Sequence, residues 1–361
     1  MWREFNGAAD QGVAVMNAIL ASFGLRPSDY AIDRIGTGHI HETYKLKGAK
    51  SFVLQRVNKN VFKQPEIIAS NLLLASDYLN RYFPGYYFLR SIPSINKTEM
   101  VYDAEGFPWR LFPYLENTVT IDKVDTREEA FSAASEFALL TRYLDKIEVG
   151  AFQETIPQFQ DLALRYRQFE IALACSNNER RHLAEQIIVL CKRFYHLVKN
   201  YNTLIGNGLL RLRITHNDTK INNILFDSST RKAVCVIDLD TLMPGYFIYD
   251  LGDMVRTFVS PVSEEEKDFS KIIFRKEIYD ALLEGYLSQM DMVMSPVEKS
   301  TIPFAGKMMT YIMALRFTAD YLNGDVYYHT DYPGQNLVRA GNQLRFLEEL
   351  ETSLPGGYTE N

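Results

Sequence analysis

The chain has 361 residues, of which 47% are hydrophobic and 23% are charged, and its formal net charge is -6. This length and composition predict a globular protein with two domains or two lobes rather than one core. The acidic balance excludes the broad basic surface of a general nucleic-acid binder, so we expect no nucleic-acid partner.

The first twenty residues lack the basic region and long apolar core of a secretory signal. No apolar run approaches the length of a membrane-spanning helix. The three cysteines are odd in number and lack the spacing of metal ligands. We therefore expect a cytoplasmic protein without a membrane partner.

The first third of the chain predicts a small, mainly antiparallel sheet with one inserted helix. Apolar spacing predicts a helix over 11–24, two strands around a glycine turn in 30–48, and a third strand in 51–57. A second helix is predicted over 65–83, with proline at its start. Residues 100–116 predict a further strand pair that turns at the letters AEG.

After about residue 116 the hydrophobic period becomes helical, and Thr126 and Glu129 have the spacing of a capping box. Further helical patterns occupy 159–173, 179–200, 264–290, 303–323 and 336–352. Short strands are predicted near 210–215, 223–227 and 232–239. We therefore predict an α+β fold with a β-rich N-lobe over 1–116 and a larger, mainly helical C-lobe over 117–361.

Residues 214–227 read ITHNDTKINNILFD, a dense polar cluster next to an apolar strand. Asp218 follows His216 by two residues and precedes Lys220 by two and Asn223 by five, which is typical of a catalytic loop for phosphoryl transfer. Asp218 would accept or orient the proton of the attacking hydroxyl group. Lys220 would face the γ-phosphoryl group, and Asn223 would bind a metal ion through its amide oxygen.

Asp238 would complete a metal site, because it emerges at the end of the apolar strand AVCVI. Mg²⁺ prefers oxygen ligands, usually one or two carboxylates with phosphate oxygens and water. Asp240 would serve as a second ligand or support the first. The alternative for the letters HND is a helix cap or an Asx turn. The combination of Asp218, Asn223 and Asp238 behind a β-rich lobe favours catalysis.

Two glycines in the letters RIGTGHIHETY, Gly36 and Gly38, would let a hairpin turn lie close over the phosphates of a nucleotide. A G-x-G sequence also occurs in many ordinary hairpins, so its position on the first predicted hairpin is the main argument.

The segments THNDTKINNILFD and IDLDTLMPGYFIYDLGDMVR resemble the aminoglycoside phosphotransferase/choline kinase superfamily of protein-kinase-like small-molecule kinases. Most of the chain is similar, in order, to the bacterial N-acetylhexosamine 1-kinases. That similarity is carried by IGTGHIHETY, EEEKDFSKIIF, LRFTADYLNGDVYY and YPGQNLVR. The resemblance implies a bilobal protein-kinase-like fold. It also implies a reaction in which ATP and an N-acetylhexosamine give the sugar 1-phosphate and ADP, with Mg²⁺.

On matching positions, the resemblance implies Asp218 as the catalytic base and Asn223 and Asp238 as metal ligands. It also implies that the letters FPYLE form a hinge between the lobes. Backbone groups at residues 113–115 would receive the adenine there, and these residues are Pro113, Tyr114 and Leu115.

The resemblance further implies that His39 and Arg316 lie near the sugar. From the sequence alone, Arg316 shares a helical face with Asp320, so a surface salt bridge is the alternative. Tyr321 would stack on a pyranose face. The partner is then a small-molecule sugar, bound by a monomer or a weak dimer.

One position departs from the kinase pattern. Protein kinases carry a lysine on the third strand, where this chain has Gln55 with Arg56 next to it and on the opposite face. Lys220 would then carry more of the contact with phosphate.

Two rival functions use the same residues. One is a kinase for an amino alcohol or an aminoglycoside, because residues 319–332 are rich in acidic and aromatic side chains. The other is a pseudokinase-like binding module. The missing lysine favours it, and the complete set of Asp218, Asn223 and Asp238 argues against it.

Overall fold

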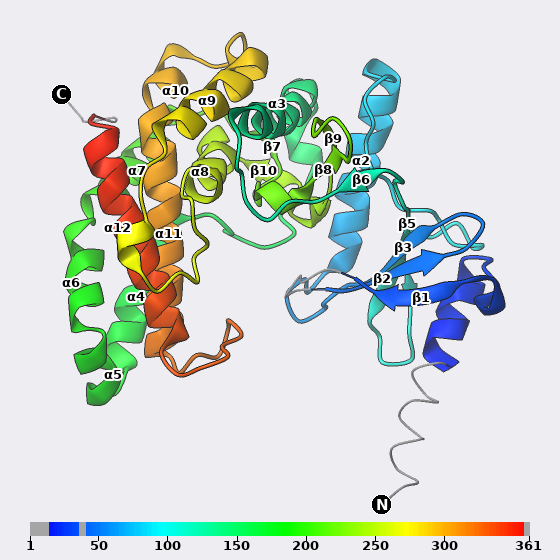
Figure 1. Ribbon diagram of the computed structural model, residues 1–361, viewed down its shortest axis with the longest axis horizontal. Coiled ribbons are helices and arrows are strands. Elements are labelled where there is room, and N and C mark those ends of the chain that lie inside the picture. The colour runs from blue at the N-terminus through cyan, green and yellow to red at the C-terminus, as the bar shows by residue number, and fades with distance from the viewer. Residues whose placement is uncertain (1–13, 36–40, 357–361) are drawn as a thin grey trace, which may run out of the picture. The chain divides into compact units, whose positions relative to one another are not determined.

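The computed structural model describes residues 14–35 and 41–356 (Figure 1). The chain forms two compact units, and the division falls after Asn117. The N-terminal unit holds the sheet and one long helix, and the C-terminal unit holds most of the helices. The predicted α+β protein-kinase-like fold, with an antiparallel N-lobe and a helical C-lobe, is thereby confirmed.

The described part of the N-terminal unit contains an antiparallel sheet with the strand order β1-β2-β3-β5-β4. Its strands are β1 (Ala31–Arg34), β2 (Glu42–Lys47), β3 (Phe52–Arg56), β4 (Val101–Tyr102) and β5 (Pro108–Pro113). The inserted helix is α2 (Pro65–Tyr82), and a short 3-10 turn, η1 (Pro27–Asp29), precedes β1. Proline at the first position of α2 confirms the predicted helix start.

One face of this sheet is covered by the helical residues 14–22. Leu54 on β3 and Trp109 and Leu111 on β5 pack there in a buried apolar cluster. Because side chains alternate along a strand, the residues between them point to the other face of the sheet.

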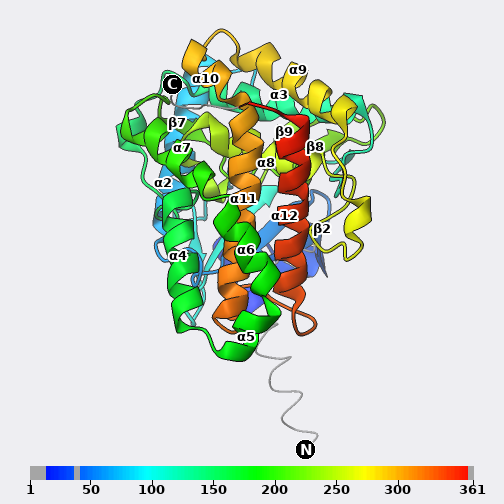
Figure 2. The same ribbon diagram turned by 90° about the vertical axis from the view of Figure 1, so that its left-hand side faces the viewer.

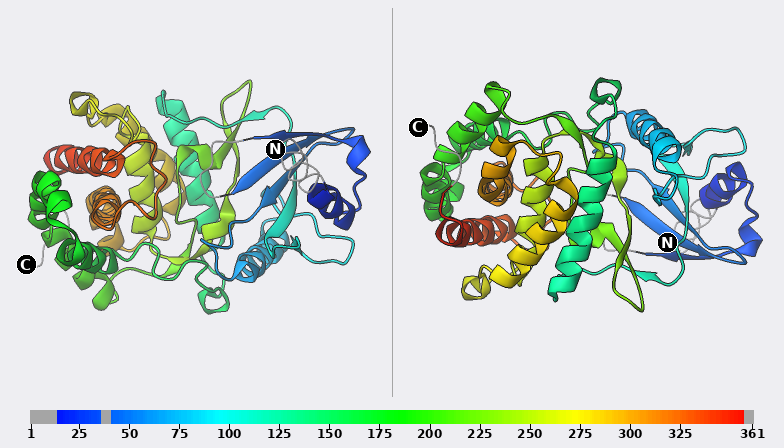
Figure 3. Two further views of the ribbon diagram at one scale, coloured as in Figure 1. Left: turned by 90° about the horizontal axis from the view of Figure 1, so that it is seen from below. Right: turned by 90° about the horizontal axis from the view of Figure 1, so that it is seen from above.

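The C-terminal unit is built around α11 (Ile302–Leu322), which is buried on nearly all sides. A helix that is apolar all round must be enclosed by others. In Figures 2 and 3, α11 lies among α4, α6, α8 and α12. The other helices of this unit are α3 (Arg127–Tyr143), α4 (Leu162–Cys175), α5 (Asn178–Leu183), α6 (Glu185–Arg193), α7 (His196–Gly206), α8 (Phe247–Phe258), α9 (Lys276–Met290), α10 (Pro296–Ser300) and α12 (Gln335–Ser353).

Two small sheets carry the polar loops of this unit. Their strands are β6 (Thr118–Val119), β7 (Arg213–Thr215), β8 (Ile224–Asp227), β9 (Ala233–Val236) and β10 (Met243–Gly245). The first sheet has the order β6-β8-β9, and the second pairs β7 with β10. The 3-10 turns are η2 (Val149–Ala151), η3 (Ile221–Asn223), η4 (Leu239–Thr241) and η5 (Phe269–Lys271).

The predicted capping box is confirmed. The backbone N–H of Glu129 donates to Thr126 Oγ1 at 3.1 Å, and Glu129 Oε2 accepts the Thr126 N–H at 3.3 Å. These reciprocal bonds satisfy two of the donors that a helix start leaves without a partner.

Two predicted helices were wrong in extent. The pattern over 179–200 is three helices, because the chain turns at Ala184 and Phe194 to bury both side chains. The pattern over 264–290 is α-helical only from Lys276, and before it the range holds the short 3-10 turn η5. Just before that start, the Arg275 guanidinium donates to the carbonyls of Phe258 and Val259, so tertiary contacts replace the first helical turns.

Among the described helices, none combines the length and the apolar character that crossing a membrane requires.

Candidate active site

The polar loop after β7 is held by one buried carboxylate. The backbone N–H groups of His216 and Asn217 donate to the two oxygens of Asp250, at 3.0 and 2.7 Å. Asp250 lies in the first turn of α8 and is buried. Burial raises its pKa, although the two backbone N–H groups oppose that change. The loop is therefore fixed to α8 rather than mobile at the surface of the unit.

Asn217 makes the tight turn inside this loop, with φ at 66°. Asparagine tolerates that left-handed conformation better than most residues. Its amide nitrogen donates to the carbonyls of Thr215 at 3.0 Å and Thr241 at 2.9 Å. A Cβ on Gly245 would lie 2.1 Å from Thr215 Oγ1 and 2.7 Å from Asn217 Oδ1, so only glycine fits beside this turn.

His216 joins the loop to the end of β9. Its Nδ1 lies 3.2 Å from the backbone nitrogen of Asp218, which can only donate, so Nδ1 is the acceptor. Nε2 therefore carries the proton and donates to the Ile237 carbonyl at 3.0 Å. The hydroxyl of Thr241 donates to the His216 carbonyl at 2.6 Å. The histidine ring thus bridges the loop and the end of β9 and fixes the position of Asp218.

Asp218, Lys220 and Asn223, which the sequence placed in one site, are in contact. Lys220 Nζ lies 3.0 Å from Asp218 Oδ1, and the Asn223 amide nitrogen lies 3.2 Å from Asp218 Oδ2. Burial alone would raise the pKa of Asp218, but the nearby positive charge, that of Lys220 foremost, and the Lys220 hydrogen bond outweigh it and lower that pKa. The Asp218 carboxylate in turn raises the pKa of Lys220. Asp218 is therefore a carboxylate, the form that accepts a proton.

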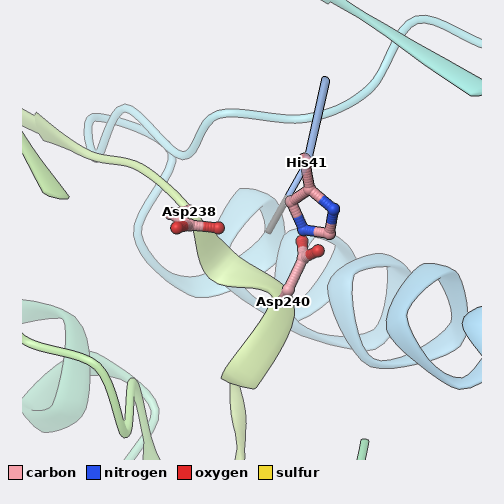
Figure 4. A group of neighbouring side chains, drawn as sticks. All are labelled: His41, Asp238 and Asp240. Atoms are coloured by element: carbon pink, nitrogen blue, oxygen red, sulfur yellow. The ribbon is translucent and has the colours of Figure 1, made fainter. Parts of the chain in front are cut away.

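Asn223 and Asp238 are brought together by the β8–β9 ladder. The Ile237 N–H donates to the Asn223 carbonyl at 2.9 Å, so the next residue, Asp238, leaves the ladder beside Asn223. Asp238 has φ 56° and ψ 54°, which ends the strand earlier than the predicted 232–239. A carboxylate oxygen of Asp238 lies within 4.8 Å of one from Asp240 (Figure 4).

The donor atoms of this region suit Mg²⁺. Asp238 and Asp240 offer carboxylate oxygens, and the Asn223 amide nitrogen already donates to Asp218, which leaves its amide oxygen as the ligand atom. An all-oxygen set without cysteine is what a hard divalent cation prefers.

Behind the loop lies an ion network that sequence analysis did not single out. Arg256 donates to Asp253 Oδ1 from Nε at 2.9 Å and from Nη2 at 2.8 Å, and its Nη1 lies 3.0 Å from Glu264. After Asp218, the charges of Asp253 and Glu264 are the next to raise the pKa of Lys220. The signal for this network was present in the letters YDLGDMVR, where two aspartates sit in an otherwise apolar helical segment.

Arg316 lies among aromatic rings. Its Cζ is 5.3 Å from the ring centroid of Phe159, 5.6 Å from that of Tyr328 and 5.8 Å from that of Tyr327. A second guanidinium, Arg165, donates to the Phe159 carbonyl. Burial lowers the pKa of Arg165 to about 10, and the neighbouring charge of Arg316 contributes to that shift. Two cations and three rings therefore share one region.

Two polar atoms of this region, Arg165 Nε and Tyr328 Oη, are buried without a hydrogen-bond partner among the described residues. Buried polar atoms are usually satisfied, so such atoms point to a ligand or to ordered water. Glu264 and Tyr327 add to the effect of burial in raising the pKa of Tyr328, whereas Arg316 opposes it.

Tyr321 is buried beneath the Arg180 guanidinium, which lies 4.7 Å from its ring centroid. Asp320 accepts the backbone N–H groups of residues 326–328 at 2.8–3.0 Å and the Asn336 amide at 3.0 Å. Asp320 thus holds the loop that carries the two tyrosines. Among the described residues, no ion pair joins it to the arginine one turn earlier in the helix.

The expected adenine-binding segment follows directly on β5. Pro113 is the last residue of that strand, and the Tyr114 N–H donates to the Ser51 carbonyl at 3.2 Å. Lys45 Nζ lies 3.3 Å above the Tyr114 ring centroid. Leu115 is half-buried. Since the N–H of Tyr114 is already bonded, the adenine contact would use the other backbone groups of this segment.

The expected phosphate-covering glycines, Gly36 and Gly38, and the expected sugar contact, His39, lie outside the described residues.

Comparison with known proteins gives one family. The sequence matches the phosphotransferase enzyme family over residues 32–289. The fold is similar to a microcompartment-associated aminopropanol kinase, with 14% identity, a TM-score of 0.61, and 94% of this chain and 98% of that chain covered. It is also similar to the amicoumacin kinase hAmiN, in complex with AMP-PNP, Ca²⁺ and Ami, with 13% identity, a TM-score of 0.61, and coverage of 98% and 97%. A choline/ethanolamine kinase family protein from Mesorhizobium loti gives 14% identity, a TM-score of 0.56, and coverage of 95% and 94%.

Proposed function

The chain belongs to the phosphotransferase enzyme family, and from that premise we propose that it transfers the γ-phosphoryl group of ATP to the anomeric (C1) hydroxyl of an N-acetylhexosamine. N-acetylglucosamine and N-acetylgalactosamine are the acceptors we have in mind. The products are ADP and the sugar 1-phosphate. ATP as the phosphoryl donor is supported by the family and by the arrangement of Asp218, Lys220 and Asn223. The choice of C1 rests on the sequence resemblance described above.

In this proposal the C1 oxygen of the sugar attacks the γ-phosphorus while Asp218 accepts the proton of the C1 hydroxyl. The bond from that phosphorus to the β,γ-bridging oxygen then breaks, and ADP leaves. Three contacts support the role, because Lys220, Asn223 and the His216 ring fix the carboxylate and its backbone. Lys220 then faces the transferred group and offsets its negative charge. Asp250 is the residue that keeps this geometry in place.

Asn223, Asp238 and Asp240 would hold Mg²⁺, which when bound supplies charge neutralisation to the phosphates of ATP. The protein's own contribution is to hold these ligand atoms in position. Asn223 is fixed by its bonds to Asp218, and Asp238 by its position at the end of the ladder.

The main observation that supports a neutral sugar as the acceptor is the pair of guanidinium groups, Arg165 and Arg316, among three aromatic rings. A positively charged acceptor would be repelled by both groups. A neutral, hydroxyl-rich ring can instead accept hydrogen bonds from them and stack on an aromatic face. The buried Tyr328 hydroxyl and Arg165 Nε offer further polar atoms for such a ligand.

The rival acceptor is an amino alcohol or an aminoglycoside, and two of the similar structures, an aminopropanol kinase and a choline/ethanolamine kinase family protein, favour that reading by name. Cation recognition would need acidic groups, which residues 319–332 contain. Two of these carboxylates are already engaged, however. Asp320 holds the loop backbone, and Asp325 pairs with Arg180 at 2.7 Å. We therefore favour the neutral sugar.

The test is an acceptor panel with Mg²⁺ and ATP, in which ADP release is measured with N-acetylglucosamine, N-acetylgalactosamine, choline, 1-amino-2-propanol and an aminoglycoside. The proposal expects turnover with the two sugars and none with the amines above the acceptor-free rate. Preferred turnover of an amine would replace the sugar with the rival acceptor. An absence of ADP release with every acceptor, combined with unimpaired ATP binding, would favour the binding module.

A further inference from the structure

The peptide group that joins Asn217 to the candidate base, Asp218, is held on both of its sides. Its N–H, which belongs to Asp218, donates to His216 Nδ1 at 3.2 Å. Its carbonyl oxygen, which belongs to Asn217, accepts a hydrogen bond from Gln160 Nε2 at 3.0 Å. The peptide group is planar, so its orientation sets the direction in which the next side chain leaves the backbone. Gln160 therefore contributes to the position of the Asp218 carboxylate.

Gln160 belongs to a short segment just before α4, residues 158–160, which we call the linking segment. Arg165 on α4 donates to the carbonyls of the first two residues of this segment, at 3.3 and 2.6 Å. Arg316 on α11 lies against the middle residue, with its Cζ 5.3 Å from the ring centroid of Phe159. Three consecutive residues thus connect the two arginines proposed to bind the sugar with the backbone of the base.

The linking segment contains two features that lower stability. Gln160 is only 6% exposed, and its side-chain oxygen has no hydrogen-bond partner among the described residues. An unsatisfied buried polar atom is costly, and an apolar side chain of similar size would avoid that cost. Gln158 has φ at 51°, in the left-handed region that is unfavourable for residues other than glycine. Such features gather at functional sites, so stability alone does not explain this segment.

We propose that Gln160 is a positioning residue for phosphoryl transfer, which fixes the acceptor region relative to Asp218 so that a bound sugar presents its C1 hydroxyl to the carboxylate. The inference rests on the proposed function, because it requires a sugar bound at the two arginines. Gln160 acts through the Asn217 carbonyl and does not need to touch the substrate. A carbonyl only accepts hydrogen bonds, so the side-chain nitrogen of Gln160 is the atom that faces it.

Two substitutions remove the donor. Gln160→Met keeps the length of the side chain without a polar atom. Gln160→Glu keeps its shape, and its ionised carboxylate cannot donate to a carbonyl. The matched control is Gln343→Met on α12. Gln343 is 4% exposed, its Nε2 donates to Asn342 Oδ1 at 3.1 Å, and its side-chain oxygen also has no partner among the described residues. Thermal melts establish that each variant is folded.

The measurement follows ADP and sugar phosphate in the same sample, with Mg²⁺, ATP and N-acetylglucosamine. A misplaced C1 hydroxyl lets water accept the γ-phosphoryl group, which gives ADP and inorganic phosphate without sugar phosphate. The yield of sugar phosphate per ADP does not depend on how much of the protein is folded. It therefore separates a positioning role from a loss of stability, which would lower both products equally.

We expect Gln160→Met to lower the kcat for sugar phosphate by about 10- to 100-fold, as a displacement of up to about 1 Å would, with the KM for ATP unchanged. The yield per ADP should fall in both Gln160 variants and stay at the wild-type value in Gln343→Met. A wild-type yield in the Gln160 variants, or an equal fall in the control, would overturn the inference while the proposed function stands. A wild-type protein that forms no sugar phosphate would overturn both.

Discussion

The ammonium nitrogen of Lys220 lies 3.0 Å from a carboxylate oxygen of Asp218. Lys220 is the more exposed of the two, at 44% against 22%. The pair therefore places a stabilised carboxylate behind a cation that solvent or a substrate can reach. This is the arrangement expected where an alcohol must lose a proton while a phosphoryl group gains charge.

Asp218→Asn should lower kcat by about 10²–10⁴-fold, the usual worth of a general base, because an amide cannot accept the hydroxyl proton. Nucleotide affinity should remain, since the shape of the side chain is kept. The measurement is steady-state ADP release together with calorimetric ATP binding. Asp291→Asn is the matched control, because it changes an exposed aspartate that also pairs with a lysine, Lys299 at 2.6 Å. A kcat in Asp218→Asn equal to that of the control would remove Asp218 from the role of base.

Asp238→Ala should weaken the binding of Mg²⁺-ATP and abolish transfer, because a charged metal ligand is lost. Binding of ATP in the presence of EDTA should be the same in the variant and the wild type. The measurement is a Mg²⁺ titration of ATP affinity by calorimetry. An unchanged Mg²⁺ dependence in the variant would show that Asp238 is not a ligand.

Asp250→Ala should affect both stability and rate. It leaves the N–H groups of His216 and Asn217 without their acceptor, which costs about 1–3 kcal/mol for each buried group. The loop would then shift, and a displacement of about 1 Å can cost on the order of 10²-fold in rate. Asp250→Asn keeps one acceptor oxygen and should lie between the wild type and Asp250→Ala in both measurements. Urea unfolding and kcat test this, and an Asp250→Ala variant that is destabilised yet fully active would contradict the positioning role.

The buried pair of Arg213 and Glu298 predicts a dependence of stability on pH. Glu298 Oε2 lies 3.1 Å from Arg213 Nη2. Burial raises the pKa of Glu298, but the Arg213 hydrogen bond and backbone donors outweigh it and lower that pKa below its ordinary value of 4.5. Because the folded pKa lies below the unfolded one, ionised Glu298 stabilises the fold fully above about pH 4.5, and this contribution is lost as the pH falls through the folded pKa.

Glu298→Gln should therefore lower the free energy of unfolding by about 3–5 kcal/mol at pH 7, as expected when one partner of a buried pair is removed. The difference from the wild type should shrink as the pH falls below about 4.5. Denaturant unfolding between pH 3 and 7 measures it, with the exposed Glu284→Gln as control. A difference that stays constant down to pH 3 would show that the ionisation of Glu298 does not contribute.

Arg316→Ala should raise the KM for the sugar far more than the KM for ATP, because its guanidinium faces the aromatic region rather than the catalytic loop. An amine acceptor would instead be unaffected or improved when this positive charge is removed. Steady-state kinetics with each substrate varied in turn separate the two cases. A larger change in the KM for ATP would place Arg316 with the donor.

Local patterns in the sequence predicted much of this fold and part of the candidate site. The capping box at Thr126 was predicted from two letters, because its hydrogen bonds are made within one turn of helix. The placement of Asp218 and Asn223 in one loop was likewise predicted from a spacing of five residues, and the structure brings their side chains into contact. Interactions of this kind are determined by residues that are close together in the sequence.

Other features depend on contacts between distant segments, and sequence patterns carry little information about them. Asp250 accepts a hydrogen bond from the backbone of a loop more than thirty residues earlier in the chain. Arg165 and Arg316 approach each other only because α4 packs on α11. The predicted helix over 264–290 was wrong at its start for the same reason, since Arg275 donates to the carbonyls of Phe258, the last residue of α8, and of Ser260.

The position of phosphate on the product tests the central claim most directly. Wild-type protein, Mg²⁺ and γ-labelled ATP are incubated with N-acetylglucosamine or N-acetylgalactosamine, and the labelled sugar is isolated. The account predicts an acid-labile phosphate ester on C1 that no longer reduces copper reagents, and no labelled sugar from Asp218→Asn. An acid-stable phosphate on a primary hydroxyl, or label that appears on choline in preference to either sugar, would contradict it.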